Sequence, residues 1–159
     1  MSSKMLRSKE DNDYLIWSMY TEILVQCLAT MNEVHVPSLD ICPLHDGKYC
    51  DGSFDPTRSI KSSKIYIHIP MKSNLRTLKE DLEITVIHEF GHYLHHCELG
   101  TDKARKADME MYLDSTSYRR KDERENWLRT RKLAKQLRLW NKNSLAMCLK
   151  AATPAKVLK

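Results

Sequence analysis

The sequence contains little that would place the chain outside the ordinary globular class. Only 4 glycines and 5 prolines occur among its 159 residues, which excludes a collagen-like or low-complexity chain. No apolar run approaches the ~20 residues that a membrane-spanning helix needs. No apolar run of the kind found in secretory signals follows the basic residues at the start. We therefore expect a cytoplasmic protein that does not contact a membrane.

Cysteines are few, odd in number and widely spaced. In a chain without an export signal, this pattern favours reduced thiols over a disulfide framework. Cys42, His45 and Cys50 could together bind a metal, but no fourth ligand follows at a suitable spacing. We therefore expect Cys42 and Cys50 to be small buried apolar residues. The five cysteines are Cys27, Cys42, Cys50, Cys97 and Cys148.

Positive charge is concentrated in one segment. The formal net charge of the chain is +5, yet residues 119–138 contain nine Lys or Arg and three Asp or Glu, a net of +6. A basic helix face of this kind is most often simply solvated. Its alternative role is to attract nucleic acid or an acidic protein partner through its field.

Hydrophobic periodicity predicts a largely helical chain. Apolar residues recur every three or four positions in two long segments, which is typical of amphipathic helices that pack against a core. Two shorter segments in the C-terminal half show the same spacing more weakly. The four predicted helices cover residues 11–31, 74–97, 103–114 and 121–140.

Short strands are predicted between the first two helices, so we expect an α+β fold. Residues 34–54 contain short apolar pieces separated by Pro and Gly, which indicates short strands and turns. In residues 63–70, isoleucines alternate with Tyr66 and His68, the pattern of a half-buried strand. We expect one domain over residues 11–141. We also expect residues 1–10 to be disordered and residues 142–159 to form a loosely ordered basic tail.

The segment His88–His92 spells HEFGH, the pattern HExxH, inside the predicted second helix. Two histidines at i and i+4 project from one face of a helix, so both imidazoles can bind one zinc ion. Glu89 then lies within reach of a water molecule bound to that ion and is predicted to be the general base. The sequence therefore predicts a Zn²⁺ site with His88 and His92 as ligands and Glu89 as the catalytic residue.

A third protein ligand is expected, because catalytic zinc sites take three and leave one position open. His96 is unsuitable, since it lies ~12 Å from His88 along a straight helix that rises 1.5 Å per residue. Glu123 lies on the stripe of the last helix that is expected to face the core, whereas Glu125 points largely the other way. We predict Glu123 as the third ligand, with Glu125 and Glu110 as alternatives.

Two motifs and the order of the elements carry a resemblance to a known family. The motifs are TVIHEFGHYLHH at 85–96 and ERENWLRTRKLA at 123–134, and the strand SKIYIHI precedes both. Together they resemble the ImmA/IrrE family of small zinc metallopeptidases, which are gluzincin-type zincins that are often phage-encoded. The resemblance extends over about residues 11–139 and is specific over 85–96. It implies a zincin-like fold, with an edge strand of a small mixed sheet packed on a central HExxH helix flanked by N- and C-terminal helices.

The family's zinc ligands are the two histidines of HExxH and a Glu in a motif close to ExxAN. Mapped onto this sequence, the resemblance implies that Glu123 is this Glu. Asn126 and Trp127 stand where the motif has Ala and Asn. By analogy with zincins, the strand Ser63–Ile69 would be the edge strand that pairs with an extended substrate. The candidates for stabilising an oxyanion are Tyr93, Tyr112, Tyr118, His95 and His96.

The resemblance implies a zinc-dependent endopeptidase that hydrolyses peptide bonds of a protein or peptide substrate, such as a repressor or another regulatory protein. The alternative is a metal-stabilised binding module without catalysis, in which the basic helix contacts nucleic acid or an acidic partner. Glu89 favours the enzyme, because a binding module does not need a carboxylate beside the metal. His95 and His96 are otherwise expected at the surface or as neighbours of the ligands.

Overall fold

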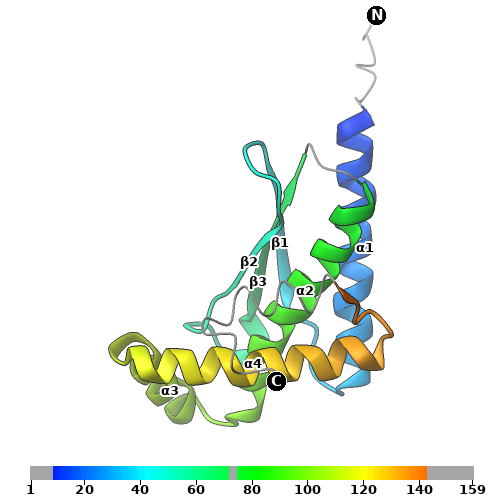
Figure 1. Cartoon of the computed structure of the whole chain (residues 1–159). Helices are drawn as coiled ribbons and strands as arrows, with labels where there is room; N and C mark the ends of the chain where they lie inside the picture. Colours follow the sequence, from blue (N-terminus) through cyan, green and yellow to red (C-terminus); the bar gives the residue numbers. More distant parts are fainter. Residues whose placement is uncertain (1–8, 72–74, 143–159) are drawn as a thin grey trace, which may run out of the picture.

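The computed structural model describes residues 9–71 and 75–142, which form an α+β fold (Figure 1). Within these residues the fold contains four α-helices and a small mixed sheet of three strands, and the sheet packs mainly against α2 and α1. No helix among them is long and apolar enough to cross a lipid bilayer. The elements in chain order are α1 (Lys9–Met31), β1 (Ser38–Leu44), β2 (Asp51–Phe54), the 3-10 helix η1 (Ile60–Ser62), β3 (Lys64–Pro70), α2 (Leu75–Glu98), α3 (Asp102–Asp114) and α4 (Thr116–Gln136).

Helix α1 packs along α2 and the sheet through its second half. Leu24, Val25, Leu28 and Ala29 are buried there, because their spacing places them on one side of the helix. The helix begins at Lys9, so the expected disorder of residues 1–10 is wrong for residues 9 and 10. Residues 1–8, and the predicted basic tail from 143 onward, lie outside the described residues.

The sheet has the strand order β1-β3-β2, so β3 is its central strand. Strand β1 pairs with β3 in parallel and β2 pairs with it antiparallel. Ile65, Ile67 and Ile69 of β3 are buried in the core, as their alternation predicts. The expectation that Ser63–Ile69 forms the edge strand is wrong. Alternation of apolar and polar residues predicts that a strand has one buried face. It does not predict whether the strand lies at the edge or in the centre of the sheet, because this depends on which distant segments pair with it.

Helix α2 is the central helix of the fold. Its side chains Val86, Ile87, Phe90 and Tyr93 are fully buried between the sheet, α1 and α4. Val and Ile favour helices only weakly, so burial of this broad apolar surface holds the segment in helical form. The HExxH segment occupies the fourth and fifth turns of this helix.

Helix α4 crosses α2 and contacts it, with α3 beside its first turns (Figure 1). It begins at Thr116, five residues earlier than the periodicity predicts. The hydroxyl of Ser115 caps the helix by accepting a hydrogen bond from the backbone N–H of Tyr118. The helix ends at Gln136 rather than near residue 140, and Arg138 follows with a positive φ of 59°.

Candidate metal centre

Helices α2 and α4 bring together three side chains of the types that bind metals. The Nε2 atom of His88 lies 3.3 Å from Oε2 of Glu123, and Nε2 of His92 lies 3.1 Å from Oε1 of the same carboxylate. The ligand atoms of all three side chains lie within 4.8 Å of one another. The two histidines are one turn apart on α2, and Glu123 reaches them from α4 because these helices cross at this point.

The three donors fit a zinc ion in chemistry and in spacing. Two ligand atoms of a tetrahedral zinc ion, each 2.0–2.1 Å from the metal, are ~3.3 Å apart. The observed separations of 3.1 and 3.3 Å agree with this value. Two imidazoles and a carboxylate also form a ligand set that zinc accepts in catalytic sites. Their role as zinc ligands stays a prediction.

The alternatives to Glu123 do not reach the two histidines. Glu110 is exposed on α3. Glu125 is exposed on α4, and one of its carboxylate oxygens lies 3.9 Å from Nζ of Lys121. Glu123 therefore lies on the inner side of α4 and Glu125 on its outer side, as the helical spacing in the sequence predicts.

Thr130 orients the ring of His88. The Thr130 hydroxyl donates its single hydrogen to the backbone oxygen of Asn126 at 2.7 Å, so towards Nδ1 of His88, 3.4 Å away, it can only accept. This contact favours a proton on Nδ1. It leaves the Nε2 lone pair facing the Glu123 carboxylate. Two acceptors at such close range need a proton or a metal ion between them, so this geometry is compatible with a metal site.

Asn126 fixes the distance between α4 and α2. Its side chain is fully buried and donates from Nδ2 to the backbone oxygen of His88 at 2.9 Å. That nitrogen is almost equally far from both ring nitrogens of His88, at 3.4 and 3.5 Å, so it is aligned with neither lone pair. Gly91 makes this approach feasible, because a Cβ added there would lie 2.5 Å from Oδ1 of Asn126. The ring of Trp127 packs beside that of His88, with centroids 4.1 Å apart.

Glu89 lies between the histidines and strand β2. It is 8 % exposed, and burial raises the pKa of its carboxyl to about 7. Gly52 of β2 passes so close that a Cβ added there would lie 2.7 Å from Cγ of Glu89 and 3.0 Å from Cγ2 of Thr85. A carboxyl group with a pKa near neutrality is suited to exchange protons at physiological pH.

The charges of the three predicted ligands depend on one another. Burial lowers the pKa of His88, and Glu123 offsets this only in part. Burial also acts to lower the pKa of His92, but its hydrogen bond with Glu123 and the nearby carboxylates raise it overall. Burial acts to raise the pKa of Glu123, yet its hydrogen bonds with the two histidines hold it well below its usual range. The centre therefore contains an ionised carboxylate.

A cleft of about 490 Å³ opens beside the predicted ligands. Strand β2 forms one wall through Gly52, Ser53 and Phe54, and α3 forms another through residues that include Tyr112. The phenol of Tyr112 lies 3.5 Å from Oε1 of Glu123. Among the oxyanion candidates, Tyr112 is therefore the tyrosine that lines this cleft beside the predicted ligands.

Other oxyanion candidates are engaged elsewhere. Tyr93 is fully buried and donates to the backbone oxygen of His35. Tyr118 donates to Asp108. His96 is 4 % exposed, and its Nε2 lies 3.0 Å from the backbone oxygen of Arg58, so a surface position for it is wrong.

A second cluster, which the sequence pattern did not reveal, lines the same cleft. Nε2 of His95 lies 3.5 Å from Oδ1 of Asp108 and 3.6 Å from Oδ1 of Asp122. On the opposite edge of the ring, Nη2 of Arg129 lies 3.5 Å from Nδ1. A metal bound at Nε2 would require a proton on Nδ1, where this guanidinium already presents donors. The cluster therefore fits a metal less well than the first.

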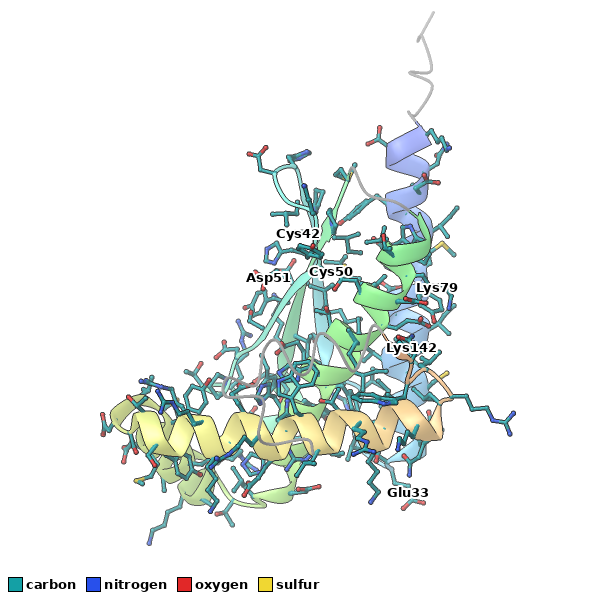
Figure 2. The ribbon with its side chains drawn as sticks, in the orientation of Figure 1. Glu33, Cys42, Cys50, Asp51, Lys79 and Lys142 are labelled. Carbon is teal, nitrogen blue, oxygen red and sulfur yellow. The ribbon has the colours of Figure 1, made fainter. Side chains whose placement is uncertain are left out.

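The segment with Cys42, His45 and Cys50 forms no such cluster in the described part of the chain. Cys42 lies in β1 and Cys50 directly precedes β2, and Figure 2 shows both away from α4. Both thiols are partly buried rather than fully buried. The backbone N–H of Cys50 donates to Asp81 at 2.6 Å, and burial raises the pKa of the Cys50 thiol. A reactive thiolate is therefore disfavoured at this position.

Comparison with protein-family models, with curated proteins and with solved structures gave no match to this chain.

Proposed function

We propose that the protein is a zinc-dependent metallopeptidase of the zincin type, similar to the ImmA/IrrE family, with His88, His92 and Glu123 as zinc ligands. The observation that supports this most strongly is the convergence of two imidazole nitrogens and one carboxylate at 3.1 and 3.3 Å, beside a buried Glu89. A metal-binding motif that occurs by chance would not require a third ligand at the same point.

The proposed chemistry divides between the metal and the protein. A zinc ion held by these residues would polarise a substrate carbonyl and lower the pKa of a water molecule. Glu89 would take the proton from that water and later deliver it to the leaving amine. Its burial and the close approach of Gly52 restrict bulk water around its carboxylate. Tyr112 would donate a hydrogen bond to the developing oxyanion from the α3 side of the cleft.

The substrate would be an extended segment of a protein, bound along β2 in the cytoplasm. Strand β2 pairs with β3 on one side only among the described residues, and Gly52, Ser53 and Phe54 line the cleft. An extended peptide could add to this edge through backbone hydrogen bonds and so present a carbonyl to the centre. A regulatory protein such as a repressor is the substrate class that the family resemblance implies.

The ligand assignment is tested by elemental analysis of untagged protein after incubation with zinc and removal of the excess. We expect one zinc per chain in the parent and in Glu125→Ala and Glu110→Ala, which remove a matched exposed carboxylate. Glu123→Ala should lose the zinc. Equal zinc content in Glu123→Ala and the two controls would refute the third ligand. No zinc in the parent would refute the metal centre.

The catalytic assignment is tested with Glu89→Gln, which preserves the shape of the side chain and removes its basicity. We expect this variant to bind zinc as the parent does and to have no measurable hydrolysis of fluorescein-labelled casein. Full activity in the variant would exclude Glu89 as the base. A parent that binds zinc but cleaves neither casein nor a mixed peptide library would favour the alternative, a metal-stabilised binding module.

A further inference from the structure

Helix α4 separates its charges between two faces. Asp122 and Glu123, two of the three acidic residues in the basic segment 119–138, turn inward and line the cleft. Glu125 is the acidic residue of this segment that remains exposed. The inward face is completed by the buried residues Asn126, Trp127, Thr130, Leu133 and Ala134. The outward face therefore has a larger excess of positive charge than the net charge of the segment indicates.

The cations of the outward face form a narrow stripe. At ~100° per residue, six of them fall within an arc of roughly 120° around the helix axis. They extend from Arg120 to Lys135, which are ~22 Å apart along the axis at 1.5 Å per residue. Five of the six are exposed and Arg131 is partly exposed, and of the six only Lys121 forms an ion pair within the described residues. This basic stripe consists of Arg120, Lys121, Arg124, Arg131, Lys132 and Lys135.

We propose that the basic stripe binds the phosphate backbone of double-stranded nucleic acid without sequence preference. The six cations form two groups of three, at 120–124 and 131–135, separated by ~10 Å along the axis. Over ~22 Å they average one charge per ~4 Å, comparable to the 3.4 Å axial spacing of phosphates along one strand of a duplex. Three of the six are arginines, whose planar guanidinium groups bind phosphate oxygens in pairs. A straight helix packed on a core presents these charges without a large loss of backbone entropy.

The composition of this face favours a duplex over other polyanions. A helix that binds an anionic membrane inserts an apolar face, but the apolar face of α4 is buried in the core. Leu128, at 49 % exposure, is the exposed large apolar residue within the arc of the stripe. An acidic protein rarely presents a continuous line of charges at such short spacing, whereas the duplex backbone always does.

The proposal does not depend on the metal centre or on catalysis. Glu123 lies ~120° around the helix from the centre of the basic stripe, so a duplex bound along the stripe would leave the cleft accessible. If both proposals hold, the cleft would lie about one helix diameter, ~10 Å, from the nucleic acid, where proteins bound to the same duplex could reach it.

The test is fluorescence anisotropy with the full chain and 20-base-pair duplexes of two unrelated sequences, at 50 and 200 mM salt. The variant Arg124→Glu/Lys132→Glu reverses two charges of the stripe. The control Lys9→Glu/Lys48→Glu makes the same change in net charge at the start of α1 and in the β1–β2 connection, at the opposite end of the molecule from α4 (Figure 1). The neutral pair Arg124→Gln/Lys132→Gln provides a second, milder variant. Thermal unfolding of each protein checks its fold.

The parent should bind both duplexes with equal affinity and lose about 100-fold in affinity between the two salt concentrations, as expected for about four phosphate contacts. Charge reversal in the stripe should weaken binding at least tenfold at 50 mM salt and the neutral pair by a smaller factor, whereas the control should stay within twofold of the parent. Equal losses in the stripe and control variants would overturn the proposal, as would no binding by the parent. So would equally tight binding of polyglutamate or of phosphatidylserine vesicles that is weakened by the same stripe variants.

Discussion

Gly91, the residue before the second histidine of HExxH, should not tolerate even a methyl group. Alanine is preferred over glycine in a helix by ~1 kcal/mol, so propensity alone predicts that Gly91→Ala stabilises α2. The added Cβ would, however, lie 2.5 Å from Oδ1 and 3.3 Å from Cγ of Asn126. A carbon–oxygen contact normally measures ~3.3 Å or more, so α4 would have to move by ~0.8 Å.

Asn126 cannot relieve this contact by rotating. Both ends of its amide are bonded, to the backbone oxygen of His88 at 2.9 Å and to Nη1 of Arg129 at 3.1 Å, and the side chain is fully buried. Overpacking of this kind costs about 1–3 kcal/mol. After the gain in helix propensity, Gly91→Ala should lose about 0–2 kcal/mol, or up to roughly 8 °C in Tm, instead of gaining the ~1 kcal/mol that propensity alone predicts. Zinc binding should weaken as well, since metal sites tolerate displacements of only ~0.2 Å.

Urea and thermal unfolding of four proteins measures this effect: the parent, Gly91→Ala, Asn126→Ala and the double variant. In the Asn126→Ala background the added methyl has room, so Gly91→Ala should there become neutral or stabilising. The sign of the Gly91→Ala effect thus depends on residue 126. A higher Tm for Gly91→Ala in the otherwise unchanged protein would refute the close packing of α2 on α4.

Three further changes test neighbouring features. Thr130→Val removes the acceptor beside Nδ1 of His88 and should weaken zinc binding 10- to 100-fold in a competition assay with a chelator, whereas Thr130→Ser should retain the affinity; equal affinities would exclude the orienting role. Gly52→Ala should lower casein hydrolysis at unchanged zinc content, because its Cβ would displace Glu89; undiminished activity would argue against this packing. Burial raises the pKa of Asp81 above its ordinary value of 3.8, so its ionisation destabilises the folded state as the pH rises. Asp81→Asn should therefore be more stable than the parent at neutral pH, with the difference vanishing as the pH falls below the ordinary value of 3.8, and parallel stability curves would contradict this.

Helical periodicity predicted the positions of α1, α2 and α4 within about five residues, because each buries one continuous face; α3, which has no fully buried residue, was also placed within a few residues. It also predicted which glutamate of α4 faces the two histidines, since phase on a helix depends only on local spacing. The strand arrangement was not accessible in the same way. Strand β3 is central, and β2 lies at the edge beside the cleft. This order results from pairing between distant segments, which local spacing does not predict. The start of α4 was missed because the capping role of Ser115 is a single-residue feature outside the apolar pattern.

The residues around the predicted ligands show why a motif specifies less than a site. Where the motif of the resembled family has Ala and Asn, this chain has Asn126 and Trp127. Both contact His88: the Asn126 amide donates to the backbone oxygen of His88, and the ring of Trp127 packs beside the imidazole. An amide this large beside α2 is compatible with the helix crossing only because position 91 has no side chain. Asn126 on α4 and Gly91 on α2 therefore depend on each other, because the larger residue fits only where the other has no side chain. Single-residue patterns cannot express this dependence, and the Gly91–Asn126 double-mutant cycle measures it directly.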